Sequence, residues 1–294
     1  MPVKSDDAGV GAHRCRPSRR GAALKDEAVG PVRTDLPRLP PPMHPKTPRI
    51  LQLVTVDSTQ AEAQRRAAAG ERGPLWISAG QQTQGRGRSG RAWASPSGNL
   101  AATLLLRPQA PLAMLPQLSL VTGVAAIDAV APFLARQPDA PPLRLKWPND
   151  LLIGDAKLAG ILIETSIIGV DTLAMIGIGI NIAEAPPVSG RDVTRLADHS
   201  NTPPPPSALL QSLSNSMAHW LEIWSKGAGF TAIRTAWLAR ALPEGASITV
   251  NAGDGPVHGS FVGLDMDGAL LLLEPSGHRR RFSWGDVSVL PTKN

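Results

Sequence analysis

Two long apolar runs near the middle of the chain limit its fold most. Residues 158–164 and 173–182 consist almost only of aliphatic side chains and glycine, without the alternation of a strand that faces water on one side. Such runs are typical of central strands in a sheet that is covered on both faces. Strand-like and helix-like segments surround them, so we expect an α+β (mixed α/β) fold with a mixed central sheet.

The other elements of this part are predicted from local patterns of apolar and breaking residues. We expect strands at residues 50–56, 75–78, 99–106, 143–146 and 151–153. We expect helices at residues 59–69, 112–136, 207–224 and 230–241. The second of these helices contains Pro132 near its end, where a proline removes a backbone donor.

The pattern changes after residue 242. Five short strand-like segments follow, separated by glycine and aspartate turns, at residues 247–251, 256–264, 269–273, 279–283 and 287–290. Asp265-Met266-Asp267-Gly268 is a hairpin signal between two of them. Five short strands in about fifty residues predict a small barrel. We therefore expect one domain over residues 49–242 and a β-barrel over residues 243–294.

Residues 1–48 differ in composition from the rest. They contain nine prolines and no apolar periodicity, which predicts a disordered, proline- and arginine-rich tail. The chain has a formal net charge of +6, but residues 1–50 hold 10 Lys and Arg against 5 Asp and Glu, so most of the excess lies here. A solvated tail and a nucleic-acid-binding arm both stay open, and residues 1–42 could precede a true start at Met43. The five acidic residues and the lack of an apolar stretch argue against a transit peptide or secretory signal.

The cysteine content and the longest apolar stretch exclude further classes. Cys15 is the only cysteine, so neither an intrachain disulfide nor a cysteine-based zinc site can form. The stretch 113–135 is interrupted by prolines and polar residues and does not predict a membrane span. We therefore expect a cytoplasmic protein without a membrane partner.

Residues 82–93, with the sequence Q-T-Q-G-R-G-R-S-G-R-A-W, form the most informative segment. Three glycines allow a ligand to approach the backbone, three arginines supply donors for carboxylate and phosphate oxygens, and Trp93 can cover a flat ring. The glycine spacing matches the dinucleotide-binding fingerprint, but no helix follows and no acidic residue comes about twenty positions later. The alternative is a flexible basic surface loop.

Three further polar motifs interrupt the predicted sheet: K-W-P-N-D at 146–150, K-L-A-G-I-L-I-E at 157–164 and G-I-G-I-N at 177–181. Buried charge requires a partner or a ligand, so the two lysines could meet carboxylate or phosphate groups. Asn149 could bind a ring edge and Asp150 a hydroxyl, a cation or Mg²⁺. The alternatives are a turn at 148–150, a solvated lysine at 157, and glycines that allow tight packing of a helix.

In their order and spacing these motifs, together with D-S-T at 57–59 and S-P at 95–96, resemble the biotin–protein ligase family over roughly residues 50–292. The resemblance implies a catalytic domain like that of class II aminoacyl-tRNA synthetases over residues 49–242, followed by an SH3-like barrel. It implies that biotin attacks Mg·ATP to give biotinyl-5′-AMP and pyrophosphate. A lysine of a biotin carboxyl carrier protein or domain, such as that of acetyl-CoA carboxylase, would then displace AMP. ATP and biotin would be substrates with Mg²⁺, and no tightly bound prosthetic group is expected.

The resemblance also implies roles for individual residues. Contacts to biotin are implied for Ser58, Thr59, Gln60, Gln82, Arg86, Gly87, Arg88, Lys157, Gly160 and Leu162. Contacts to ATP or the adenylate are implied for Arg88, Arg91, Trp93, Lys146, Asn149, Asp150 and Asn181. Lys157 and Arg88 would be catalytic, and Asp150 is a candidate metal ligand. Gln60 stands where the family commonly has Asn.

Some members of this family carry an N-terminal winged helix-turn-helix and repress transcription. Residues 1–48 are too short and too rich in proline for that domain, so we expect a monofunctional ligase that does not bind DNA. A homodimer stays open. So do two other functions: a lipoate–protein ligase of the same superfamily, and a nucleic-acid-binding protein that uses the arginine-rich tail and loop.

Overall fold

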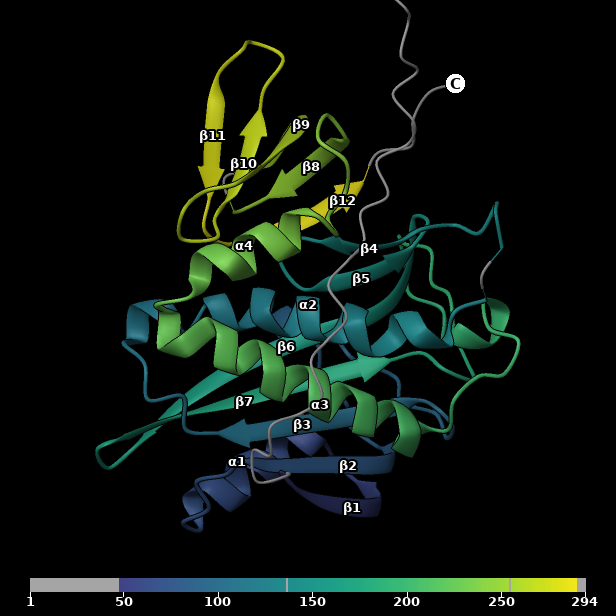
Figure 1. The fold of residues 1–294 in the computed structure, drawn as a ribbon, viewed down its shortest axis with the longest axis vertical. Coiled ribbons are helices and arrows are strands. Elements are labelled where there is room, and N and C mark those ends of the chain that lie inside the picture. The colour runs from purple at the N-terminus through teal and green to yellow at the C-terminus, as the bar shows by residue number, and fades with distance from the viewer. Residues whose placement is uncertain (1–47, 136, 254, 290–294) are drawn as a thin grey trace, which may run out of the picture. The chain divides into compact units, whose positions relative to one another are not determined.

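The computed structural model describes residues 48–289 except 136 and 254, and a seven-stranded mixed sheet forms its centre (Figure 1). The strand order is β1-β2-β3-β7-β6-β5-β4, with β1 and β2 parallel and all other neighbours antiparallel. The strands are β1 (Arg49–Val56), β2 (Leu75–Gln82), β3 (Leu100–Leu106), β4 (Leu143–Lys146), β5 (Asp150–Ile153), β6 (Ala156–Ile168) and β7 (Asp171–Ile180). The predicted mixed sheet is confirmed. The predicted tail lies outside the described residues except for residue 48.

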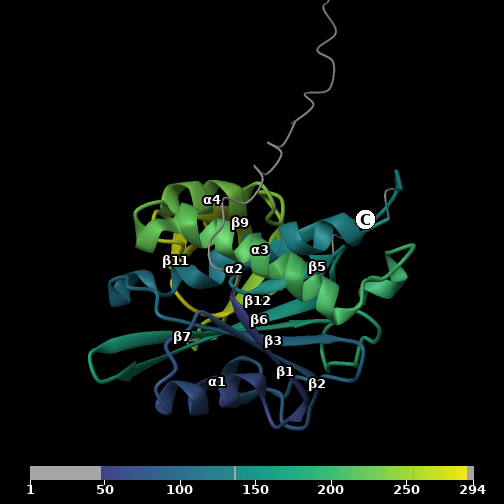
Figure 2. The ribbon, with the colours of Figure 1, turned by 60° about the horizontal axis from the view of Figure 1, so that its bottom comes forward.

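Helices cover both faces of this sheet (Figure 2). They are α1 (Thr59–Ala68), α2 (Gln117–Val130), α3 (Pro206–Trp224) and α4 (Phe230–Leu238). Helices α2 and α3 pack on one face, α4 packs against these two helices, and α1 lies on the other face. Within β7 the side chains alternate between the two cores: Ile176 packs in the larger one and Met175 in the smaller one beneath α1. Coverage on both faces explains why the two apolar runs, now β6 and β7, contain so few polar residues.

The prediction of one helix over residues 112–136 is wrong in its extent. A 3₁₀ turn covers Leu112–Met114, α2 covers Gln117–Val130, and a second 3₁₀ turn covers Ala131–Phe133. Pro116 occupies the N-cap of α2, and Pro132 comes two residues after Val130, the last residue of the helix. Because proline has no N–H to donate, it limits the helix at both places. Residue 136 lies outside the described residues.

The five predicted C-terminal strands are confirmed to within about one residue at each end. They are β8 (Ser247–Asn251), β9 (Pro256–Leu264), β10 (Leu270–Leu273), β11 (Arg279–Phe282) and β12 (Asp286–Val289). They form an antiparallel sheet in the order β11-β10-β9-β8-β12, which we call the barrel sheet. In the predicted hairpin, Asp265 N–H donates to Ala269 O over 2.7 Å, and Gly268 has φ +94°. Such a positive φ favours glycine at this position.

The barrel sheet packs on the same apolar core as α2 and α4. The rings of Trp237 and Phe261 meet edge to face at 6.5 Å between centroids, and Trp147 donates a hydrogen bond to Gly268 O over 3.1 Å. Lys146 Nζ donates to Val287 O over 2.9 Å, which brings β12 to the end of β4. One edge of the barrel sheet therefore lies beside the K-W-P-N-D motif. The division into domains at residue 242 stays a prediction.

Candidate active site

One cavity of about 510 Å³ collects polar residues from motifs far apart in the sequence. Its volume lies in the range of small-molecule sites. Every residue for which the resemblance implied a role lines it: Ser58, Thr59, Gln60, Gln82, Arg86, Gly87, Arg88, Arg91, Trp93, Lys146, Asn149, Asp150, Lys157, Gly160, Leu162 and Asn181. The structure therefore brings these residues together, although the contacts implied for each stay predictions.

Uncharged hydrogen-bonding groups gather where α1 begins. Thr59 donates to Gln82 Oε1 through its N–H over 2.8 Å and through its hydroxyl over 3.1 Å. Gln82 Nε2 donates to Ser95 Oγ over 2.7 Å, and the Thr103 hydroxyl donates to Thr59 Oγ1 over 2.9 Å. The Ser58 hydroxyl is buried and has no hydrogen-bond partner among the described residues. Buried hydroxyls are almost always paired, so this one is available to a polar group of a ligand or to an ordered water.

Three strand glycines are explained by side chains that approach them. A Cβ atom on Gly179 would collide with the Trp93 indole, and one on Gly160 would lie 3.3 Å from the same ring. Gly160 and Gly179 pair across β6 and β7, so the indole rests on a smooth surface formed by both strands. A Cβ atom on Gly177 would lie 2.7 Å from Gln60 Oε1. The structure thus favours close approach of a side chain over helix packing as the reason for these glycines.

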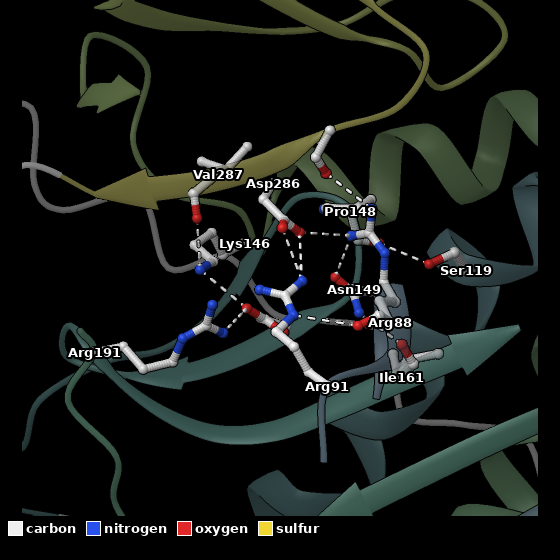
Figure 3. A network of polar contacts seen from close by, with 12 residues as sticks. Arg88, Arg91, Ser119, Lys146, Pro148, Asn149, Ile161, Arg191, Asp286 and Val287 are labelled. Carbon is white, nitrogen blue, oxygen red and sulfur yellow. Dashed lines mark hydrogen bonds and ion pairs between the residues drawn. The ribbon is translucent and has the colours of Figure 1, made fainter. Parts of the chain in front are cut away.

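The arginine–glycine loop, residues 85–93, reaches across the cavity to the barrel sheet (Figure 3). Arg88 donates to Asn149 Oδ1 and to Gly285 O, each over 2.9 Å. Arg91 binds both carboxylate oxygens of Asp286 at 2.9 and 2.8 Å. The loop is therefore attached to the K-W-P-N-D turn on one side and to β12 on the other. The alternative of an unattached basic surface loop does not describe it.

A buried carboxylate organises the cations on the floor of the cavity. Asp150 forms ion pairs with Lys157 Nζ at 2.5 Å, Lys146 Nζ at 3.0 Å and Arg191 Nη1 at 3.7 Å. Its side chain is 6% exposed, and that of Lys157 is 13% exposed. Lys157 is thus not the solvated strand-start lysine of the alternative interpretation. The turn at 148–150 exists, and it also directs Asp150 into the site.

Burial and neighbouring charges shift the pKa values of Asp150 and Lys157 in opposite directions. Burial alone would raise the pKa of the Asp150 carboxyl, but Lys157 and Lys146 together outweigh it and hold that pKa below its usual value. Burial lowers the pKa of Lys157 even though Asp150 partly counteracts the effect. Asp150 is therefore an anion at neutral pH, and the floor carries more positive than negative charge.

Comparisons with known proteins agree with this geometry. Residues 54–181 match the biotin/lipoate A/B protein ligase family, and residues 245–290 match the biotin protein ligase C-terminal domain. A biotin–[acetyl-CoA-carboxylase] ligase of Paracoccus denitrificans is 40% identical over 239 residues, which are 77% of this chain and 95% of that protein. The chain belongs to the biotin protein ligase family.

Other members of this family agree in sequence and in fold. The bifunctional ligase/repressor BirA of Bacillus subtilis is 31% identical over 243 residues, which are 78% of this chain and 70% of that protein. The biotin protein ligase of Aquifex aeolicus in complex with biotin and ATP superposes with a TM-score of 0.69 at 28% identity. The match covers 83% of this chain and 99% of that one. The family resemblance and the implied fold class are thereby confirmed.

The described part of the cavity in this biotin protein ligase shows few side chains of the kind that hold a metal ion. No cluster of three or more His, Cys, Asp and Glu side chains lies close enough for a metal ion within residues 48–289. The carboxylate of Asp150 already contacts two lysines, which a metal would have to displace. Mg²⁺ commonly binds through substrate phosphates and keeps several waters, so an ion carried by ATP needs no such cluster. The role of Asp150 as a metal ligand stays a prediction.

The lining residues outside the motifs include Thr103, Arg191, Asp286 and Val287. Thr103 had a signal, because it is the only polar residue in the strand sequence L-A-A-T-L-L-L. Arg191 lies in a loop without a recognisable pattern, and the other two belong to the barrel. In the part of the chain that the structure describes, no helix is long and apolar enough to cross a membrane.

Proposed function

We infer that this protein is a biotin protein ligase that activates biotin with ATP and transfers it to a biotin carboxyl carrier acceptor. One observation supports this most: the cavity joins an uncharged hydrogen-bonding end to a strongly cationic end. The first contains the unpartnered Ser58 hydroxyl, and the second contains Lys146 and Lys157. Biotin has an uncharged ureido ring and a carboxylate tail, so it would span this gradient.

The first half-reaction joins two anions. An oxygen of the biotin carboxylate attacks the α-phosphorus of ATP, the bond to the bridging oxygen breaks, and pyrophosphate leaves with its electron pair. Six cationic side chains and two carboxylates line the cavity, which leaves four net positive charges to offset the repulsion. Lys157, buried beside the Trp93 ring at 5.5 Å, is suited to the reacting oxygens. Positioning in line supplies a further part of the acceleration.

The second half-reaction transfers the acyl group. The amine of the acceptor lysine attacks the carbonyl carbon of biotinyl-5′-AMP, AMP leaves, and the nitrogen loses a proton. Before that step the mixed anhydride must be kept from water, which requires a cover over the cavity. The arginine–glycine loop is suited to this role, since Arg88 attaches it to Asn149 and to Gly285 O.

We propose that the acceptor belongs to acetyl-CoA carboxylase, since that enzyme stands in the name of the Paracoccus denitrificans relative.

We also propose that the protein acts without binding DNA. The support is the charge balance, because residues 51–294 hold 20 Lys and Arg against 19 Asp and Glu. A homodimer is compatible with the proposal and is tested by sedimentation of the purified chain.

The decisive experiment incubates the protein with Mg·ATP, a biotin carboxyl carrier domain and either biotin or lipoate, and reads the carrier by mass spectrometry. We expect the mass of one biotinyl group on the carrier lysine and AMP as the co-product. A carrier domain whose acceptor lysine is replaced by arginine is the control. Modification with lipoate alone would favour the lipoate ligase instead. Salt-sensitive DNA binding by a chain that starts at Met43 would contradict the proposal of no DNA contact.

A further inference from the structure

Arg191 has no role in the motifs, yet it lines the same cavity as the arginine–glycine loop. It lies between β7 and the 3₁₀ turn at Leu196–Asp198. The residues directly after it are attached to the start of β6: Lys157 N–H donates to Asp192 O, and Thr194 N–H donates to Lys157 O, each over 2.9 Å. These backbone bonds fix the position of Arg191 relative to Lys157.

The guanidinium of Arg191 is the third cation around a single carboxylate. It lies 3.7 Å from Asp150 Oδ2, an oxygen that already contacts Lys146 Nζ at 3.0 Å, while Lys157 contacts the other oxygen. Within the described residues its side chain donates no hydrogen bond shorter than 3.5 Å, and it is 30% exposed. A guanidinium presents five donors in a planar fork, which suits an anion with several oxygens. The structure therefore leaves a cation at the cavity without a matching anion of its own.

The position of Arg191 indicates which anion it takes. Lys157 lies beside Gly160 and the Trp93 ring, where the biotin carboxylate and the α-phosphate would meet. Arg191 and Lys146 share the opposite oxygen of Asp150, and Lys146 continues to the barrel through Val287 O. In Figure 3 the Arg191 guanidinium points toward the same space as the Lys146 ammonium and the Arg91 guanidinium. With the biotin carboxylate placed at Lys157 by the proposed function, this side of the cavity would be the farther one from it.

We propose that Arg191 binds the β- and γ-phosphates of ATP and holds the pyrophosphate group as it leaves. The proposal rests on the proposed function, because it assigns one end of the same cavity. A guanidinium that binds two phosphate oxygens at once stabilises both the bound triphosphate and the leaving pyrophosphate. It makes no contact that the transfer of biotin from the finished adenylate requires.

The test compares Arg191→Ala with Arg195→Ala, a matched variant in the same loop. Arg195 pairs with Asp198 at 3.0 Å, donates to Ala183 O over 2.7 Å and does not line the cavity. For Arg191→Ala we expect the KM for ATP and the inhibition constant of inorganic pyrophosphate to rise about tenfold, as for one lost charge-assisted contact. We expect single-turnover transfer from purified biotinyl-5′-AMP to the carrier to stay within about twofold of wild type. Arg195→Ala should leave all three quantities unchanged.

Unchanged values for ATP and pyrophosphate in Arg191→Ala would overturn the proposal. An equal loss in the transfer step would also overturn it, because that result indicates damage to the whole site. Arg191→Lys keeps the charge and should recover part of the pyrophosphate affinity, and no recovery would contradict an electrostatic role. If the wild-type protein forms no biotinyl-5′-AMP, the proposed function fails. Calorimetric binding of pyrophosphate to wild type and Arg191→Ala still decides the assignment of Arg191.

Discussion

Two aspartates contact cationic side chains at the same cavity, but one is buried and the other is exposed to solvent. Asp150 lies on β5 in the seven-stranded sheet, is 6% exposed, and contacts both lysines of the site. Asp286 opens β12 in the barrel sheet, is 42% exposed, and contacts Arg91 of the arginine–glycine loop. The first arrangement forms the floor of the cavity, and the second joins its cover to the barrel.

The difference in burial separates a fixed part of the site from a part that can open. Removing one partner of a buried ion pair leaves an uncompensated charge and costs several kcal/mol, about 3–5. An exposed pair contributes at most about 1 kcal/mol, because water and salt screen it. The floor is therefore preorganised before substrates arrive. If the loop is the proposed cover, it is attached weakly enough to admit ATP, release pyrophosphate and admit the carrier lysine in turn.

The largest effect is expected on activity when the floor loses its central cation. Lys157→Ala should lower the rate of biotinyl-5′-AMP formation by about 100- to 1000-fold, because it removes the buried ammonium that lies next to Gly160. Pyrophosphate release with biotin and ATP measures this rate. Lys146 and Arg191 still neutralise Asp150 in this variant, so circular dichroism should show a folded protein. Near-normal activity would contradict the distinction between floor and cover.

The next effect concerns stability. Asp150→Ala should lower the free energy of unfolding by about 3–5 kcal/mol, since it leaves Lys146 and Lys157 buried without their anion. Urea unfolding at neutral pH measures the change. Asp267→Ala, in the exposed hairpin of the barrel, is the control, and it should change stability by less than about 1 kcal/mol. Equal losses of unfolding free energy in both variants would contradict the distinction between the buried ion pairs of Asp150 and the exposed pairs of the barrel.

The pH dependence of stability sharpens this second prediction. The pKa of Asp150 is lowered in the folded protein, so its contribution is present above its unfolded pKa of about 3.9. The contribution is lost as the pH falls through the folded pKa, because the folded state must then take up a proton. The difference in unfolding free energy between wild type and Asp150→Asn should therefore shrink in acid below about pH 4. A difference that grows in acid would contradict the assigned direction.

The floor was more predictable from sequence than the cover. The motif K-W-P-N-D between apolar strands indicated polar groups at a core edge, and buried strands leave few arrangements for Lys146 and Asp150. The contact of Arg91 with Asp286 joins residues 195 positions apart, and no local pattern records it. The predicted extent of the helix over residues 112–136 was wrong for a related reason. Pro116 and Pro132 are visible in the sequence, but whether the neighbouring residues continue as α-helix or as 3₁₀ turns depends on tertiary packing. Thr103 was visible as a lone polar residue, whereas Arg191 was not.

A smaller effect is expected when the cover loses one of its anchors. Arg88→Ala removes the hydrogen bonds to Asn149 Oδ1 and Gly285 O, so the loop should open more often. We expect biotinyl-5′-AMP to dissociate about tenfold faster, corresponding to the loss of one or two charge-assisted bonds. A filter assay with preformed adenylate measures the rate. Arg279→Ala, an exposed arginine on β11, is the control. Unchanged retention of the adenylate would show that the loop is not the cover.

The smallest effect is expected at Asp286, and salt separates it from the floor. Asp286→Ala should lower the free energy of unfolding by no more than about 1 kcal/mol, because its contacts with Arg91 and Arg88 are partly exposed. A double-mutant cycle with Arg91→Ala isolates the contribution of the pair. At 1 M salt the Debye length is about 3 Å, so the coupling energy should fall close to zero. The loss caused by Asp150→Ala should largely persist at the same salt concentration, since the side chains of Lys146 and Lys157 are only 11% and 13% exposed and salt screens buried pairs much less. A salt-resistant coupling at Asp286 would mean that β12 belongs to the fixed part of the site, and that ATP must enter without parting the loop from the barrel.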